Sequence, residues 1–204
     1  MRIAIYSGSF NPIHTGHIRL AEHILSHTDT EELWFVVSPN NPLKNPKTLT
    51  DEKKRLRWVE SAIEDYERET GKKSRMAASD VELGLPRPSF TVNTLRYLTR
   101  QYPQHQFSLV IGSDNMARFD QWREWEYILQ HYPIIVYPRT GDNLTALQQQ
   151  YPQMQVLKDA PLFDISATMI REKVAKGEDV SEFVAPSVEK ELKNTNNSPF
   201  IAIN

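Results

Sequence analysis

Short apolar runs rich in β-branched and aromatic residues recur along this chain, and segments with helical periodicity lie between them. Strands that are buried on both faces of a parallel sheet have this near-continuous apolar character. The pattern therefore predicts an α/β fold with a doubly wound, mainly parallel sheet and helices on both faces. The expected strands cover residues 3–6, 33–37, 107–111 and 133–137, with a short addition at 156–157, and the expected helices cover residues 15–28, 51–69, 92–101 and 123–131.

In open sheets of this kind, ligands bind beyond the carboxyl ends of the strands. We therefore expect the functional loops to follow Tyr6, Val37, Ile111 and Tyr137. The loop at residues 38–46 is rich in Pro and Asn, and we expect it to be ordered against a ligand or to act as a lid.

Helix boundaries are marked by Asp51 and Thr91, which are expected N-caps, and by Gly71, which is an expected stop signal. A length of 204 residues allows one medium-sized domain. We predict that residues 1–204 form a single domain, with residues from about 165 to 204 as its C-terminal helical portion.

Composition excludes several classes of function. The chain has no cysteine, so disulfides, thiolate catalysis and Cys-ligated zinc are ruled out. Its 24 Lys and Arg against 26 Asp and Glu give a net charge of −2, which offers no general attraction for nucleic acid. No apolar stretch approaches the length of a membrane span. We expect a cytoplasmic protein without nucleic-acid or membrane partners, and leave open whether it forms a homo-oligomer.

The loop after the first strand reads Gly-Ser-Phe-Asn-Pro-Ile-His-Thr-Gly-His over residues 8–17 and runs into a helix. Gly8 is expected to let the backbone approach a ligand, and the start of the helix offers unpaired N–H groups to an anion. His14 and His17 lie three residues apart, so both imidazoles can point at one phosphate group. Two alternatives are that these histidines only cap the helix, or that they bind zinc, for which no third ligand stands at a recognisable spacing.

A second segment, residues 165–171, reads Ile-Ser-Ala-Thr-Met-Ile-Arg. Ser166 or Thr168 suits an N-cap, which provides another helix start for phosphate oxygens. Arg171 falls one turn later, and its planar guanidinium can bind a phosphate through two donors. The alternative is an ordinary capped helix with a surface arginine.

Together these segments resemble the His-x-Gly-His and Ile-Ser-Ser/Ala-Thr-x-Ile-Arg motifs of the nucleotidyltransferase superfamily, which has a Rossmann-like fold. Along almost its whole length the chain is similar to bacterial-type nicotinate-nucleotide adenylyltransferases. The further matching segments are Pro-Asn-Asn-Pro at 39–42, Pro-Ser-Phe-Thr-Val-Asn-Thr-Leu at 88–95, Ile-Gly-Ser-Asp at 111–114 with Trp122, and Pro-Arg-Thr-Gly at 138–141.

The resemblance implies a role for each matching position. The ATP-binding residues would be Gly8, Ser9, Phe10, His14, His17, Gly112, Asp114, Arg139, Ser166, Thr168 and Arg171. The pyridine nucleotide would be bound by Ser38, Asn40, Lys44, Thr91, Trp122 and Arg123. An indole can stack on a flat pyridine ring, although Trp122 also has the spacing of a core residue. Lys44 has an equally simple alternative as a solvated loop charge.

Three positions depart from the family pattern. Ser7 stands where the family often has glycine, and Pro-Leu-Lys at 42–44 replaces the common Pro-Pro-His-Lys/Arg. Arg123 follows Trp122 where other members often have Tyr. We hypothesise that Arg123 helps to neutralise the nicotinate carboxylate, unless Glu124 or Glu126 engages it instead.

The implied reaction is attack by the phosphate of nicotinate mononucleotide on the α-phosphorus of ATP, which expels pyrophosphate. No protein nucleophile is needed, because the attacking group is already an ionised phosphate. His14, His17 and Arg171 are the expected catalytic residues, as donors placed where charge grows. We expect Mg²⁺ as a cofactor carried by the phosphates, with no protein side chain as its ligand. Alternatives are nicotinamide mononucleotide or phosphopantetheine as acceptor, or a non-catalytic nucleotide sensor.

Overall fold

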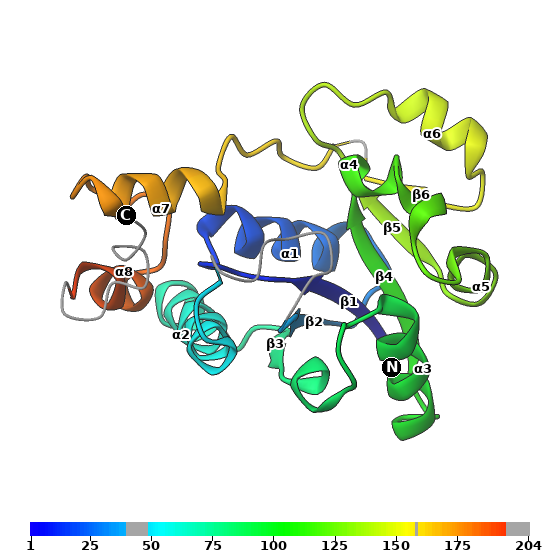
Figure 1. Ribbon diagram of the computed structural model, residues 1–204, viewed down its shortest axis with the longest axis horizontal. Helices are drawn as coiled ribbons and strands as arrows, with labels where there is room; N and C mark the ends of the chain where they lie inside the picture. Colours follow the sequence, from blue (N-terminus) through cyan, green and yellow to red (C-terminus); the bar gives the residue numbers. More distant parts are fainter. Residues whose placement is uncertain (40–48, 158, 195–204) are drawn as a thin grey trace.

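The structure is a computed structural model and describes residues 1–39, 49–157 and 159–194. Its sheet consists of six parallel strands in the order β3-β2-β1-β4-β5-β6 (Figure 1). The strands are β1 (Arg2–Gly8), β2 (Glu32–Val37), β3 (Met76–Ser79), β4 (Gln106–Gly112), β5 (Ile134–Tyr137) and β6 (Gln155–Val156). The predicted doubly wound parallel sheet is confirmed. The sequence did not predict β3.

Helices alternate with these strands along the chain. The longer ones are α1 (Thr15–His27), α2 (Glu52–Thr70), α3 (Thr91–Gln101), α5 (Trp125–His131), α6 (Leu144–Gln150), α7 (Ala167–Ala175) and α8 (Pro186–Lys193). The shorter ones are η2 (Val81–Gly84), α4 (Ser113–Met116) and η3 (Phe119–Gln121). The sequence did not predict α6 or the short turns.

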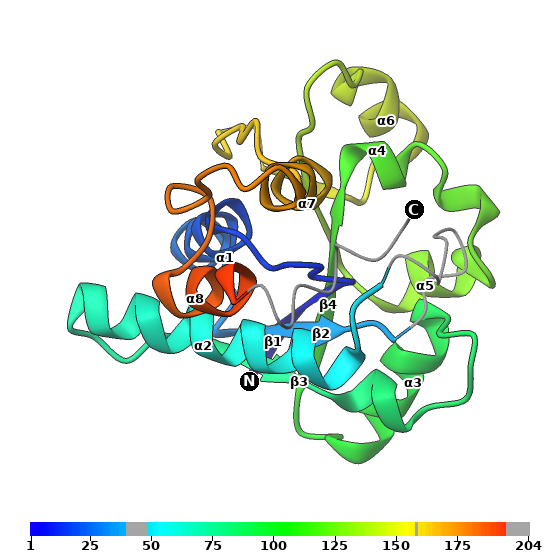
Figure 2. The ribbon, with the colours of Figure 1, turned by 60° about the vertical axis from the view of Figure 1, so that its left-hand side comes forward.

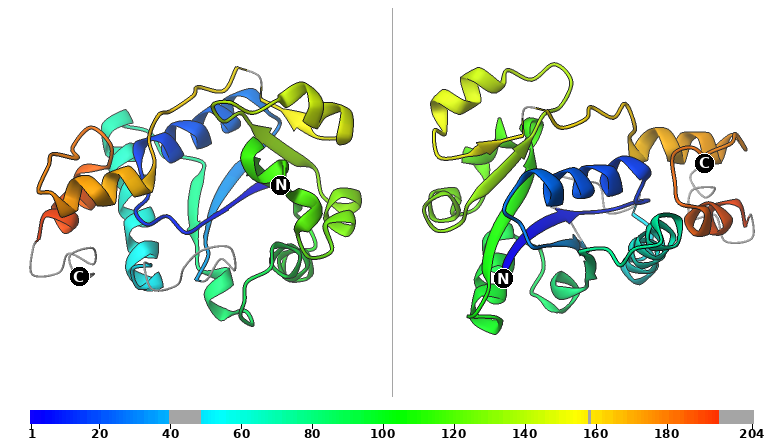
Figure 3. Two further views of the ribbon diagram at one scale, coloured as in Figure 1. Left: turned by 45° about the horizontal axis from the view of Figure 1, so that its top comes forward. Right: turned by 180° about the vertical axis from the view of Figure 1, so that it is seen from behind.

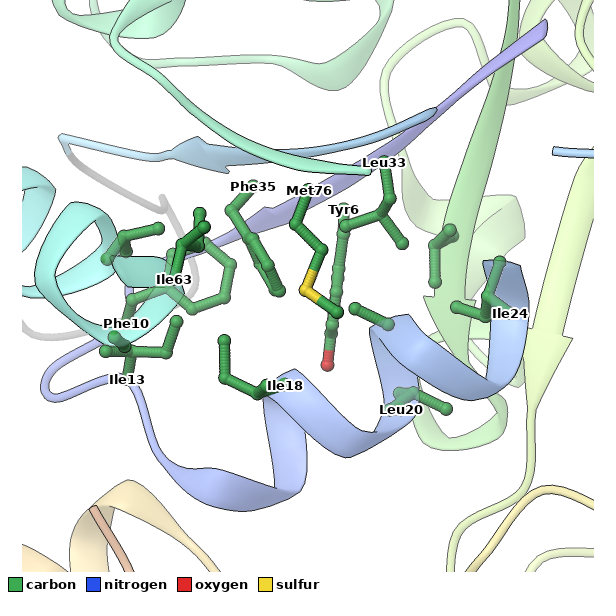
Figure 4. Packing of buried hydrophobic residues seen from close by; sticks show 14 of the residues in the cluster. Tyr6, Phe10, Ile13, Ile18, Leu20, Ile24, Leu33, Phe35, Ile63 and Met76 are labelled. Carbon is green, nitrogen blue, oxygen red and sulfur yellow. The ribbon is translucent and has the colours of Figure 1, made fainter. Parts of the chain in front are cut away.

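Two hydrophobic cores lie on opposite faces of the sheet. Helices α1, α2, α7 and α8 bury apolar side chains in the first core, and α3, α4, α5 and α6 bury theirs in the second. Figure 4 shows the first core, where Tyr6, Phe35 and Met76 project from the sheet toward α1. Because successive residues of a strand point to opposite faces, β1 alternates between the cores, with Ile5 in the second and Tyr6 in the first.

Two of the three predicted helix boundaries are confirmed, and the one at Thr91 is corrected. Asp51 caps α2 as predicted, since its side chain accepts a hydrogen bond from the Lys54 N–H. Gly71 ends α2 with a φ of 67°, in the left-handed region that glycine tolerates. The prediction of Thr91 as an N-cap was wrong: Phe90 has the extended cap conformation, and Thr91 is already the first helical residue.

The C-terminal helices lie against the first half of the chain. Figure 2 shows α8 beside α2, where the Trp58 Nε1–H donates to Glu191 over 3.0 Å and Asp65 accepts hydrogen bonds from Ser187. Figure 3 shows α7 and α8 at one end of the molecule, with α6 and β6 at the other. The assignment of residues 1–204 to one domain, with a C-terminal portion from about 165, stays a prediction.

Candidate active site

The strand order places the site at the carboxyl ends of the central strands. From β1 the chain crosses to β2 on one side, and β4 then pairs with the other side of β1. Between two such strands the crossovers cover opposite faces, so a crevice opens at their carboxyl ends. The loops after β1, β2, β4 and β5 all leave the sheet at these carboxyl ends, as the sequence predicted.

The two histidines of the first motif meet at the start of α1. His14 is the N-cap residue, and its backbone N–H donates to His17 Nδ1 over 3.2 Å. The two rings stack with their centroids 3.6 Å apart. Helix capping thus engages Nδ1 of His17 as an acceptor. In neutral His17 the proton must then lie on Nε2, which makes that atom a donor.

His14 is held in its neutral form. Its imidazole is buried, and this burial, together with the positive charge of Arg139, lowers its pKa to about 3. At neutral pH it can therefore donate one hydrogen bond and adds no positive charge.

Gly8 was predicted to let the backbone approach a ligand, but a side chain of the protein itself makes the close approach. A Cβ at this position would lie 2.8 Å from Cζ of Phe10, so the space beside Gly8 is filled by a side chain of the protein itself. Phe10 is buried against Tyr6 and Phe35 and has a φ of 41°, which few non-glycine residues adopt. Gly8 thus permits the tight packing of Phe10 that shapes the loop.

The second motif reaches the first through hydrogen bonds. Ser166 caps α7 by accepting from the Met169 N–H, as predicted. From this helix Arg171 Nη1 donates to the Asn11 carbonyl over 2.9 Å, while Nη2 donates to Thr168 over 3.1 Å. Arg171 is therefore tied to the loop between β1 and α1. The start of α1 is held in the same way, because the Thr15 N–H donates to the Phe183 carbonyl over 2.8 Å.

Two cavities open at the carboxyl ends of the strands. We call the first the histidine cavity, because His14 and His17 line it together with the start of α7 and the loop after β5. It brings together five of the predicted ATP-binding residues: His14, His17, Asp114, Arg139 and Ser166. Ser9, Phe10, Thr168 and Arg171 line neither cavity, and Gly8 and Gly112 line the second one.

We call the second the tryptophan cavity, because Trp122 forms part of its wall. The predicted acceptor residues Ser38, Thr91, Trp122 and Arg123 all line it. Trp122 also packs on Phe119, with ring centroids 5.5 Å apart, so it serves the core and the cavity at once. Asn40 and Lys44 lie outside the described residues.

Glu82 is a buried carboxylate of the tryptophan cavity that the sequence reasoning missed. It accepts hydrogen bonds from Thr94 over 2.9 Å and from Ser7 over 3.2 Å, and these hydroxyls come from α3 and β1. Burial raises its pKa. Glu82 thus connects three segments of the cavity wall. No local sequence signal distinguishes it from the surface acids of the chain.

Arg55 is a second buried charged residue near the site that the sequence did not predict. Its side chain is fully buried and donates hydrogen bonds to the carbonyls of Ser9, Ser38, Pro39 and Thr50. One guanidinium therefore joins the loop after β1 to the loop after β2, which are the first segments of the two predicted binding regions.

No group of three metal-ligating side chains occurs within residues 1–39, 49–157 and 159–194. Within the same ranges, no helix is long and apolar enough to cross a membrane.

Comparison with known proteins gives consistent matches. The sequence model of the cytidylyltransferase-like family matches residues 5–173. A protein of Flavobacterium johnsoniae named "Probable nicotinate-nucleotide adenylyltransferase" is 39% identical over 96% of this chain and 98% of its own length. A protein of the same name from Bacteroides fragilis is 43% identical over 94% of this chain and 90% of its own.

Solved structures match the fold. The nicotinic acid mononucleotide adenylyltransferase of Plasmodium falciparum, complexed with NaAD, is similar with a TM-score of 0.78 at 20% identity, over 98% of both chains. The nucleotidyltransferase fold is thereby confirmed. From its motifs, its matching residues and its relatives, the chain belongs to the cytidylyltransferase-like family and, within it, to the nicotinate-nucleotide adenylyltransferases.

Proposed function

We propose that this protein transfers the adenylyl group of ATP to nicotinate mononucleotide, forming nicotinate adenine dinucleotide and releasing pyrophosphate. The observation that carries the proposal is a pair of adjoining cavities at the switch point of the sheet, one with the histidine motif and one with Trp122. A reaction that joins two nucleotides needs two such sites side by side. Family membership supports the same activity.

ATP would occupy the histidine cavity. At the start of α1 the N–H groups of His14, Thr15 and His17 are already paired within the protein, and His17 Nε2 would be the donor to a phosphate. Asp114 would contact the ribose, and Arg139 would face the phosphates or base from the loop after β5. Arg171 and Thr168 would reach the phosphates from α7, the helix already tied to the same loop.

Nicotinate mononucleotide would occupy the tryptophan cavity, with its pyridine ring on the Trp122 indole. Ser38 and Thr91 would supply hydroxyl groups, and Asn40 and Lys44 remain predicted contacts. One oxygen of the acceptor phosphate forms the new bond to the α-phosphorus. The bond from that phosphorus to the α–β bridging oxygen breaks, and its electron pair leaves with pyrophosphate.

The protein would contribute orientation and donors, with no covalent step of its own. Holding two polyanions in line can supply about 7–11 kcal/mol in well-aligned cases. Mg²⁺ is part of the proposal as a cation that would be carried by the triphosphate. When bound, it would compensate phosphate charge. A cytoplasmic location stays a prediction, and the oligomeric state stays open.

Pyrophosphate release tests the function directly. Purified protein is incubated with ATP, Mg²⁺ and one acceptor at a time: nicotinate mononucleotide, nicotinamide mononucleotide or phosphopantetheine. We expect the highest kcat/KM with nicotinate mononucleotide. A higher value with another acceptor would replace the proposed substrate, and binding of ATP without release from any acceptor would favour the non-catalytic sensor.

Arg123 gives the acceptor preference a structural basis. Among the described residues it is the one cationic side chain that lines the tryptophan cavity. Its guanidinium lies 4.9 Å from the Phe90 ring centroid, and its nearest acid, Glu124, is 3.8 Å away. Glu124 instead pairs with Arg96 at 2.6 Å. The cation is therefore available to the nicotinate carboxylate, which nicotinamide lacks.

Replacing Arg123 by alanine should lower kcat/KM for nicotinate mononucleotide about tenfold, the effect of one charge-assisted hydrogen bond. The value of kcat/KM for nicotinamide mononucleotide should stay within about twofold, because nicotinamide has no carboxylate that could pair with Arg123. Arg118→Ala is the matched control, because Arg118 is exposed and lines neither cavity. An unchanged preference between the two acceptors in Arg123→Ala would exclude this role.

A further inference from the structure

The two cavities meet at a pair of tyrosines. Among the described residues, Tyr6 and Tyr137 are the two that line both the histidine cavity and the tryptophan cavity. Their hydroxyl groups are hydrogen bonded over 3.2 Å, and both side chains are buried. If each cavity holds one substrate, the acceptor phosphate and the α-phosphorus of ATP must approach each other near this pair.

The hydroxyl of Tyr137 itself, and not only its backbone, lies at the cavity wall. A Cβ at Gly112 would be 3.2 Å from both Cζ and Oη of Tyr137, and Gly112 is part of the wall of the tryptophan cavity. Gly112 therefore leaves open the space in which this hydroxyl sits. Any side chain at position 112 would press on the hydroxyl and on Asp114.

Hydrogen bonding determines what this hydroxyl can do. The Tyr6 hydroxyl donates to Tyr137 Oη over 3.2 Å, and Arg139 Nη2 donates to the same oxygen over 3.2 Å. A phenolic oxygen has two lone pairs and one proton, so both lone pairs are occupied. The proton of Tyr137 has no acceptor among the described residues, and the group is therefore set to donate to a ligand.

Arg139 gives the junction a positive charge. Its guanidinium carbon lies 5.1 Å from the Tyr137 ring centroid. Its Nε is buried and has no hydrogen-bond partner in the described part of the chain, with the closest carboxylate oxygen, on Asp114, at 3.8 Å. The Tyr137 hydroxyl and Arg139 Nε thus provide two unused donors beside the place where the cavities meet, which is an environment suited to an anion.

We propose that Tyr137 is a further catalytic residue, whose hydroxyl donates a hydrogen bond to an oxygen of the phosphoryl group being transferred. The proposal rests on the function proposed above. Tyr6 orients the Tyr137 hydroxyl by donating a hydrogen bond to it, so Tyr6 is a positioning residue. A donor fixed in advance at the transferred group stabilises the charge that develops there without a cost of reorganisation.

The test is the kinetics of Tyr137→Phe, which removes one oxygen and keeps the ring. We expect kcat to fall about 10- to 100-fold, the range for losing one hydrogen bond to a charged group. KM for ATP and for the acceptor should stay within about threefold, because the bond strengthens in the transition state. A wild-type kcat, or a loss confined to KM, would overturn the proposal.

Two further variants separate this role from packing. Tyr132→Phe also removes a buried tyrosine hydroxyl, one that pairs with Thr99 over 3.2 Å away from both cavities, and should keep wild-type kinetics. Tyr6→Phe should reduce kcat less than Tyr137→Phe. The reverse order would assign the role to Tyr6 instead. Thermal unfolding and ATP binding of each variant identify any loss that comes from misfolding.

Failure of this proposal is distinguishable from failure of the proposed function. If wild-type protein transfers adenylyl groups to a different acceptor, the variants are compared with that acceptor. Wild-type protein without any transfer contradicts the function, whereas active wild type with an equally active Tyr137→Phe contradicts only the role of Tyr137.

Discussion

Replacing His17 by alanine is expected to lower kcat by about 10²–10³-fold, or on the order of 2.7–4 kcal/mol, with a much smaller change in KM for ATP. The reason is the ring geometry: Nδ1 is occupied by the His14 N–H, so Nε2 carries the proton and can donate to the phosphate. Such a donor acts mainly where charge grows, so its loss affects turnover more than substrate binding. Steady-state rates of pyrophosphate release measure it.

The capping alternative is tested by His17→Asn, because an asparagine oxygen can also accept the His14 N–H at the helix start. If His17 were only a cap, this variant would restore kcat, and that result would contradict the catalytic role. We expect it to restore stability alone. His27→Ala, in the same helix but exposed and outside both cavities, is the control and should leave kcat unchanged.

Replacing Arg55 by alanine should destabilise the fold by on the order of 3–5 kcal/mol, because each buried carbonyl left without a donor costs about 1–3 kcal/mol. The four acceptors are the carbonyls of Ser9, Ser38, Pro39 and Thr50. Guanidinium chloride unfolding with linear extrapolation measures the loss. Because the acceptors belong to the loops after β1 and β2, we also expect KM to rise for both substrates.

Arg57→Ala is the matched control for Arg55→Ala. Arg57 lies on the exposed side of the same helix α2, and its removal should change stability by no more than about 0.5 kcal/mol. Arg55→Lys sharpens the test, since a lysine keeps the charge but cannot span four acceptors. Full stability of Arg55→Lys would mean that the charge, and not the planar set of donors, is what the site requires.

The parts of the fold that the sequence predicts are those with a strong local pattern. The four central strands were predicted from their apolar runs, and the topological rule for parallel sheets then located the site. Strand β3 reads Met-Ala-Ala-Ser, lies at the sheet edge and is only partly buried, so it has no such pattern. Helix α6 buries a single residue, Leu147, which is too few to give helical periodicity.

The parts of the site that escaped prediction depend on distant contacts. Glu82 bonds to Ser7 and Thr94, and Arg55 bonds to carbonyls of residues far from it in sequence. Carbonyl partners have no side-chain identity, so no motif could reveal them. Gly8 was predicted to bind ATP, but it lines the tryptophan cavity, and the close approach that requires a glycine there is made by Phe10.

The link between the Thr15 N–H and the Phe183 carbonyl, together with that between Arg171 and Asn11, has a consequence for biosynthesis. A ribosome makes the loop between β1 and α1 well before α7 and Phe183, which hold it in place. Until α7 and Phe183 have been made, a growing chain lacks both of these contacts to the loop. The loop can therefore reach its final arrangement only after synthesis has passed Phe183.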